Sequence, residues 1–261
     1  MAIIITVSNQ KGGVGKTTTS AALATGIAAA GKRVLGVDLD PQGNFGFCLG
    51  LEPAGAGTPT ILDALQGKVP VAEAVGRTEY CDILPSDISL SSGLDNAAAG
   101  HRESILKETL RPIIGLYDYV IIDTPPALNL LTVNAYAVSD FLIIPMGTDI
   151  MSLVGLSQLK ETIETVRGSF NPNLKVMGIL LTRFNRRTLL ARDVLEMAGQ
   201  LAGQIGTVVF ETKIRNGVAI AEAPAHGESI YEYSPRSAAV KDYQDFLDEI
   251  AETIHLKEQR R

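Results

Sequence analysis

Residues 8–19 read Ser-Asn-Gln-Lys-Gly-Gly-Val-Gly-Lys-Thr-Thr-Thr, and this stretch decides how the rest of the chain is interpreted. An apolar run at 3–7, rich in β-branched side chains, precedes it and predicts a buried strand. Small residues at 20–30 follow it, end at Gly31, and predict a helix. A glycine-rich loop between a strand and a helix N-terminus points several N–H groups into one concavity, so the stretch predicts a phosphate site.

The side chains of this phosphate loop (residues 8–19) have separate expected roles. Lys16 is expected to reach the β- and γ-phosphates of a nucleotide, and the Thr17 hydroxyl to bind Mg²⁺. A glycine-rich turn with a solvated lysine is the simpler alternative. We disfavour it because four features favour a phosphate loop together: the strand, the glycine spacing, the Lys-Thr pair and the helix. The predicted nucleotide contacts in the loop are Lys11, Gly12, Gly13, Val14, Gly15, Lys16, Thr17 and Thr18.

The loop departs from the ordinary P-loop pattern at its start. Gln10 stands where that pattern has glycine, and a second lysine, Lys11, comes next. This arrangement resembles the deviant Walker A motif of the ParA/MinD family of dimeric ATPases. The resemblance implies that Lys11 reaches across a homodimer to the partner's nucleotide, with ATP and Mg²⁺ as cofactors and both lysines counted as catalytic.

An aspartate pair follows the next predicted strand, at 32–39. Asp38 and Asp40 lie at its carboxyl end, where open α/β sheets bind ligands. Asp40 is a candidate for positioning an attacking water and Asp38 for the metal shell. Asp-Pro and Gln-Gly are also ordinary turn formers, so the residues alone leave both interpretations open. The string at 38–44 resembles the one after the second strand of ParA-like proteins, which implies the hydrolytic role for Asp40.

A further apolar strand delivers Asp123, followed by Thr-Pro-Pro. A carboxylate at the end of such a strand is the Walker B arrangement that holds Mg²⁺, although a turn-forming aspartate after a buried strand is a common alternative. The predicted metal residues are therefore Thr17, Asp40 and Asp123.

Strands predicted at 140–145, 174–182 and 208–210, with a helix at 152–167, alternate at the spacing of a parallel sheet. The expected fold class is α/β: a single-domain doubly wound, mostly parallel sheet flanked by helices, of the P-loop NTPase (deviant Walker A) type. The chain has 261 residues, of which 46% are hydrophobic, and no linker divides it. We expect one domain over residues 1–261 with a frayed basic tail at about 257–261.

The segment 171–192 contains basic residues and no acidic one, although the chain carries a net charge of −6. A local cationic stripe suits binding to backbone phosphates, and a solvated loop and helix start is an equally good reading from composition. ParA-like proteins bind DNA non-specifically through arginines in this neighbourhood. The resemblance implies that Arg186, Arg187 and Arg192 contact DNA, with Arg215 as a lesser candidate.

Residues 214–227 resemble the ParA/Soj segment that carries an Arg-Asn pair near the adenine, which implies that Asn216 reads the adenine edge. Two positions depart from that segment: Ile214 replaces a proline and Ala219 an arginine.

The last predicted helix, at 234–254, distinguishes a ParA/Soj-like protein from a MinD-like one within the family that the chain resembles. One face is apolar, with Val240, Tyr243, Leu247, Ile250 and Ile254 at helical spacing. The other carries acidic residues: Asp242, Asp245, Asp248, Glu249 and Glu252. A membrane-targeting helix needs basic residues there, so a MinD-like membrane-cycling positioning ATPase is the weaker alternative and no membrane contact is expected. Cys48 and Cys81 form no metal-binding pattern, which disfavours iron–sulfur relatives.

The leading hypothesis is an ATP-dependent DNA partition protein of the ParA/Soj type. It implies slow, Mg²⁺-dependent ATP hydrolysis, an ATP-sandwich homodimer that binds double-stranded DNA non-specifically, and release when a ParB-like centromere-binding protein stimulates hydrolysis. The expected location is cytoplasmic and nucleoid-associated. A ParA-like positioner of a protein cargo stays open, and a scaffold that binds nucleotide without hydrolysis is disfavoured by Lys11, Asp40 and Asp123.

Overall fold

The computed structural model describes residues 2–55, 57–93 and 102–256. Within them, seven strands form one sheet in the order β3-β4-β2-β5-β1-β6-β7. Every neighbouring pair is parallel except β3 and β4. The strands are β1 (Ile3–Val7), β2 (Val34–Asp38), β3 (Gly76–Arg77), β4 (Asp82–Leu84), β5 (Tyr119–Asp123), β6 (Phe141–Gly147) and β7 (Lys175–Thr182). The expected mostly parallel sheet is confirmed.

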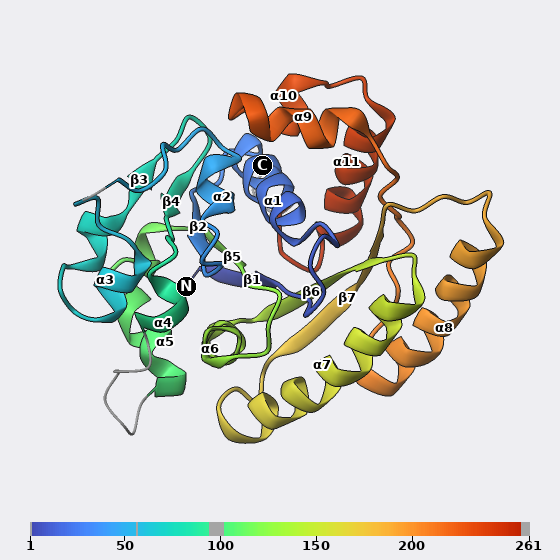
Figure 1. Ribbon diagram of the computed structural model, residues 1–261, viewed down its shortest axis with the longest axis horizontal. Coiled ribbons are helices and arrows are strands. Elements are labelled where there is room, and N and C mark those ends of the chain that lie inside the picture. Colours follow the sequence, from blue (N-terminus) through green and yellow to red (C-terminus); the bar gives the residue numbers. More distant parts are fainter. Residues whose placement is uncertain (1, 56, 94–101, 257–261) are drawn as a thin grey trace.

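Helices connect the strands and cover both faces of the sheet (Figure 1). The α-helices are α1 (Lys16–Ala29), α2 (Asn44–Phe47), α3 (Ile61–Leu65), α4 (Leu90–Gly93), α5 (Ile105–Leu110), α6 (Leu130–Val138), α7 (Ile150–Ser169), α8 (Leu189–Ile205), α9 (Val218–His226), α10 (Ile230–Tyr233) and α11 (Ala238–Ile250). Short 3₁₀ turns are η1 (Val71–Ala74), η2 (Arg102–Ser104) and η3 (Ile114–Leu116).

Two hydrophobic layers result from the strand period of two. In β1, Ile4 packs into the layer beneath α3 and α5 to α8, whereas Ile5 packs into the layer beneath α1 and α11. Strand β5 repeats this, with Val120 in the first layer and Ile121 in the second. In Figure 1, α1, α9, α10 and α11 lie on one side of the strands and α6 and α7 on the other. Each central strand is therefore buried on both faces, which explains its continuous apolar sequence.

Several helices begin at other residues than the sequence predicts, and one predicted strand is wrong. Helix α1 begins at Lys16, inside the quoted loop, and α7 begins at Ile150 because Asp149 caps it. Residues 208–210 make only an isolated parallel bridge, between Val209 and Ile179. The Phe210 N–H still donates to the Ile179 carbonyl oxygen at 3.0 Å, but the next two N–H groups, of Glu211 and Thr212, donate to the carboxylate of Glu249, so the pairing does not continue.

The last helix also differs in part from the expectation. Helix α11 is shorter, at Ala238–Ile250, and its apolar face packs on the body as predicted, with Val240 and Tyr243 buried. Asp242 was expected on the solvated face, but it is buried because it pairs with Arg215. The predicted basic tail at 257–261 lies outside the described residues. Among the helices that the structure describes, none has the length and apolarity to cross a membrane.

Strand order places three chemically important strand ends side by side. Val7 and Asp38 are both in register with Asp123, because β1 and β2 flank β5. The loops after these three strands therefore meet at the carboxyl edge of the sheet, which is where open α/β sheets bind ligands.

Candidate active site

The phosphate loop connects β1 to α1 through backbone conformations that favour glycine. Gly13 has φ of 73° and Gly15 has φ of 82°, both in the left-handed region. Gly15 is also the N-cap of α1, where no side chain caps the helix and no acidic residue lies in the first turn. The first N–H groups of α1 therefore keep their partial positive charge for an anion.

Lys16 is buried at the start of α1, and its Nζ donates a hydrogen bond to the Lys11 carbonyl oxygen at 3.2 Å. Burial lowers the pKa of Lys16, and the charges of Asp123 and Asp40 act against that shift. A buried ammonium group with a neutral carbonyl as its hydrogen-bond partner favours a negatively charged ligand. Phosphate oxygens fit this position.

Asp123 ends β5 fully buried beneath α1. Its two carboxylate oxygens accept hydrogen bonds from the Thr17 hydroxyl at 2.7 Å and the Ser20 hydroxyl at 2.9 Å. Burial raises the pKa of Asp123 to about 6, against the lowering effect of those hydrogen bonds and of Lys16. A desolvated carboxylate beside a hydroxyl is the oxygen-donor set that suits Mg²⁺, so the residues present fit the metal that the motif implies.

Asp38 and Asp40 differ in what they contact. Asp38 is fully buried, and its carboxylate accepts the backbone N–H groups of Asp40 and Phe45, both at 2.9 Å. Burial and then the charge of Asp123 raise the pKa of Asp38. Asp40 is half-buried and accepts the Gln42 N–H at 3.0 Å. Asp38 therefore shapes the loop that carries Asp40, while the carboxylate of Asp40 stays partly open to a ligand or a water.

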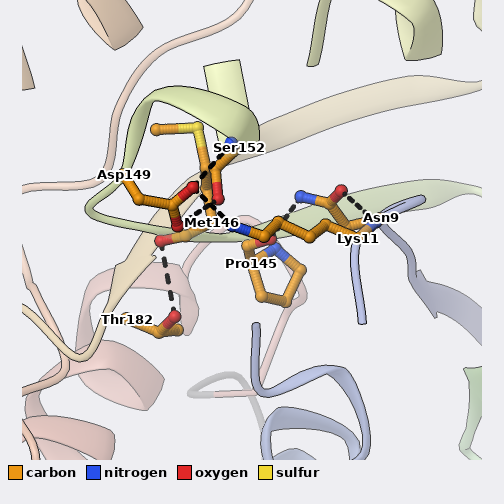
Figure 2. Close-up of polar contacts among 7 residues, drawn as sticks. All are labelled: Asn9, Lys11, Pro145, Met146, Asp149, Ser152 and Thr182. Atoms are coloured by element: carbon orange, nitrogen blue, oxygen red, sulfur yellow. Dashed lines mark hydrogen bonds and ion pairs between the residues drawn. The ribbon is translucent and has the colours of Figure 1, made fainter. Parts of the chain in front are cut away.

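Lys11 makes an ion pair within its own chain, which Figure 2 shows. Its Nζ donates to the carboxylate of Asp149, the residue that caps α7 by accepting the Ser152 N–H at 3.1 Å. Desolvation acts to raise the pKa of Asp149, but hydrogen bonds from Lys11 and Ser152 outweigh it and lower the pKa. Asn9 holds the start of the loop through the Pro145 carbonyl oxygen at 2.7 Å.

Thr182, the last residue of β7, fastens the other side of the loop. Its hydroxyl donates to the Val14 carbonyl oxygen at 2.9 Å and lies 3.3 Å from the Met146 carbonyl oxygen. Residues at the ends of β6 and β7 therefore hold the phosphate loop, which follows β1, through hydrogen bonds.

The predicted adenine residue, Asn216, is exposed in the segment after this strand end. The backbone of Ile214 bonds to Leu181 and Phe184, which places the segment beside the carboxyl end of β7, on the same edge as the phosphate loop. Asn216 is thus on the correct edge of the sheet, and its contact with adenine stays a prediction.

The predicted DNA residues line a concave surface rather than a flat stripe. A cavity of about 740 Å³ is bordered by Arg186, Arg187, Arg192, Lys213 and Arg215, which we call the basic surface, together with Phe184, Asn185, Leu195 and Glu211. Lys213 was not among the sequence candidates. It became visible only because the loop after Phe210 folds back beside α8.

Within the described residues, Arg215 is the one predicted DNA residue whose side chain forms an ion pair. Its guanidinium group forms a two-pronged ion pair with the buried Asp242, with both bonds at 2.7 Å. The arginine side chain is still 56% exposed, so a structural role does not remove it from the surface. Its predicted DNA contact stays untested.

Sequence reasoning missed Asp149, Ser152 and Ser20. Asp149 could have been found, since a capping residue that follows an apolar strand lies at the same sheet edge as Asp38 and Asp123. Ser20 lies one helical turn after Thr17, so it faces the same carboxylate.

Comparison with known proteins agrees with this geometry. A family model described as an AAA domain matches residues 2–176. The chromosome partitioning protein ParA of Myxococcus xanthus is 42% identical over 243 residues, which are 92% of this chain and 84% of that protein. The sporulation initiation inhibitor protein Soj of Bacillus subtilis is 40% identical over 254 residues, 96% of this chain and 99% of that protein. The chain belongs to the ParA/Soj family.

The ParA/Soj assignment makes the chain a P-loop ATPase, as its motifs predict. A solved structure of cobyrinic acid a,c-diamide synthase from Mycobacterium smegmatis, with a bound ATP analog and magnesium, has the same fold. The TM-score is 0.82 at 33% identity, covering 100% of this chain and 98% of that chain. The family model ends at residue 176, so it includes the phosphate loop, Asp40 and Asp123 but neither the basic surface nor Asn216.

Proposed function

We propose that this ParA/Soj-family chain is a DNA partition ATPase that uses ATP and Mg²⁺ as a timer for DNA binding. Its relatives named chromosome partitioning protein ParA support this role. The position of Lys11 carries the proposal, because its ammonium group is held by Asp149 outside the loop of its own chain. That position leaves Lys16 as the lysine of its own site, and Lys11 serves a second subunit once it leaves Asp149.

The surface around Lys11 supports a homodimer on ATP binding. Ile150, Met151 and Val154, in the first turns of α7, are 51%, 65% and 48% exposed. Exposed apolar side chains that gather beside a charged group are typical of an interface. In the proposed dimer, Lys11 leaves Asp149 and its positive charge stabilises the phosphates of the partner's ATP.

Within each site, the residues divide the work. Lys16 and the N–H groups of the loop hold phosphate oxygens, and Thr17 and Asp123 hold Mg²⁺, which neutralises phosphate charge. Asp40 orients the attacking water. Asp38 keeps the Asp40 loop in place through its two backbone hydrogen bonds.

The basic surface is the proposed contact for double-stranded DNA. Its arginines at 186, 187 and 192 are exposed, and a concave cationic surface meets the sugar–phosphate backbone without reading bases. Hydrolysis, stimulated by a ParB-like partner, would separate the subunits and release the DNA. The protein would then act in the cytoplasm on the nucleoid.

Binding to random-sequence DNA without nucleotide, with ADP and with ATP tests the proposal. We expect binding with ATP alone, retained in Asp40→Ala and lost in Lys11→Ala, Lys16→Ala and the Arg186→Ala/Arg187→Ala double variant. Lys160→Ala, which removes a half-buried lysine of α7 that belongs to neither the phosphate loop nor the basic surface, is the control. If the wild-type protein hydrolyses ATP and dimerises but ignores DNA at low salt, the partition role is wrong, and liposome binding would test the membrane-cycling alternative.

A further inference from the structure

A second cavity, of about 820 Å³, lies at the opposite edge of the sheet from the phosphate loop. It is bordered by the amino-terminal ends of β1, β6 and β7 and by α5, whereas the nucleotide site is built from the carboxyl ends of strands. A five-residue strand such as β1 spans about 16 Å. The two sites are therefore separated by the length of the strands. No step of the proposed ATPase cycle uses this cavity.

The floor of the cavity is apolar and only half-buried. Ile114 and Val138 pack against the layer beneath α5 to α8, and Ile3 and Phe141 pack against the layer beneath α1 and α11. The cavity therefore opens where both hydrophobic layers reach the end of the sheet. Partly exposed apolar side chains in a concave site favour an apolar ligand body.

The rim is cationic. Lys107, Arg111 and Lys175 line the cavity and are exposed. In the part of the chain that the structure describes, neither lysine has an ion-pair partner. Arg111 lies 3.4 Å from Glu108, and these two side chains are 80% and 64% exposed, so water screens that pair.

Acidic groups on the lining do not cancel this charge. Asp140 is occupied in part, because its Oδ2 accepts the Ile4 N–H at 2.9 Å. The ammonium groups of Lys107 and Lys175 therefore remain over an apolar floor with no ion-pair partner among the described residues, on a protein whose net charge is −6. The combination suits a ligand with a negative head and an apolar body.

We propose that this cavity binds a small amphipathic anion, with its acidic head group at Lys107 and Lys175 and its apolar body against Ile114, Val138 and Phe141. The volume lies within the range of cavities that enclose small-molecule ligands. The site is independent of the nucleotide, because it takes its residues from the other end of the strands.

Titration with 8-anilinonaphthalene-1-sulfonate, an aromatic amphipathic anion that fluoresces in apolar surroundings, tests the proposal in the full chain. The titration is run with saturating ATP and Mg²⁺, so that the nucleotide site is filled. We expect saturable binding of one probe per chain, displaced by decanoate and not by the uncharged decanol.

Charge reversal locates the site. The Lys107→Glu/Lys175→Glu double variant is expected to weaken probe binding by at least about thirtyfold, because two attractive charge contacts of about 1 kcal/mol each are lost and repulsion replaces them. Lys107→Arg/Lys175→Arg keeps binding. Lys68→Glu/Lys160→Glu, with the same change of net charge away from the cavity, also keeps it. Thermal unfolding of each variant confirms that it folds.

Three outcomes overturn the proposal. They are probe binding that ATP abolishes, equal displacement by decanol and decanoate, and equal weakening by the Lys68→Glu/Lys160→Glu control. None of these results bears on ATP hydrolysis or DNA binding, so the proposed function and this inference fail separately.

Discussion

The phosphate loop and the basic surface are built in opposite ways. In the loop, Lys16 is buried, Thr17 donates to Asp123, and Val14 is fastened by Thr182. On the basic surface, Arg186 and Arg187 are exposed and have no ion-pair partner among the described residues. The difference follows from what each must bind. A transferred phosphoryl group needs one geometry, whereas a DNA backbone needs positive charge over an area.

The strongest test of this comparison is Lys16→Ala. It removes a buried charge with a fixed position, so we expect ATP turnover to fall by about 100-fold or more, measured as phosphate release. Arg187→Ala, which removes an exposed charge, is the matched change and should leave turnover without DNA unaltered. A similar loss in both variants would mean that the basic surface shapes the catalytic site.

Asp123→Asn tests whether burial of the Asp123 carboxylate at the phosphate loop lowers the free energy of unfolding. The folded pKa of Asp123 is about 6, above its unfolded value, so the folded state holds the proton more tightly. The free energy of unfolding therefore falls as pH rises from the unfolded pKa to the folded pKa. The neutral amide removes this penalty and still bonds to Thr17 and Ser20.

We expect the free energy of unfolding of Asp123→Asn, without nucleotide or Mg²⁺, to exceed that of the wild type by about 1–3 kcal/mol at pH 8. The gain should shrink at pH 5, where wild-type Asp123 is largely protonated. Urea titrations at both values of pH measure it. Asp118→Asn, at the exposed pair with Arg33, is a control that should show no such gain. Equal stability of Asp123→Asn and wild type at pH 8 would mean that burial of this carboxylate carries no penalty.

The Arg186→Ala/Arg187→Ala double variant sharpens the other side of the comparison. Each lost phosphate contact should lower the slope of log affinity against log salt by about 0.9, so the pair should lower it by nearly two. Fluorescence anisotropy with random-sequence DNA and ATP measures the slope.

Arg215→Ala is the informative companion on the same surface. Because Arg215 is paired with the buried Asp242, its loss should lower thermal stability as well as DNA binding. An unchanged salt slope in the double variant would remove Arg186 and Arg187 from the DNA contact.

The smallest expected effect is at the Lys11 ion pair. Asp149→Asn keeps a side-chain oxygen that caps α7 but removes the negative charge that holds Lys11. Partly exposed ion pairs contribute up to about 1 kcal/mol to stability. The dissociation constant of the ATP-bound dimer should fall by up to about fivefold in sedimentation experiments. Asp118→Asn should leave it unchanged, and a weaker dimer in Asp149→Asn would contradict the release of Lys11 from Asp149.

Contiguous motifs made most of the site predictable. Lys16 and Thr17 follow the loop directly, and their partner Asp123 ends a strand whose apolar sequence is unmistakable. Asp149 was missed because its role depends on Lys11, 138 residues away along the chain. The expected strand at 208–210 is reduced to a bridge because the N–H groups of Glu211 and Thr212 donate to Glu249 of α11, a tertiary contact that overrides strand propensity.

By itself the sequence determined the fold class, the phosphate loop and the carboxylates at strand ends, because strand burial and loop geometry depend on residues that are neighbours along the chain. Only the tertiary structure decided which charges are free. Asp242 of α11 pairs with Arg215, Lys11 is held by Asp149, and Lys213 joins the basic surface. Ion pairs form between side chains brought together by packing, and no local pattern in the sequence encodes that distance.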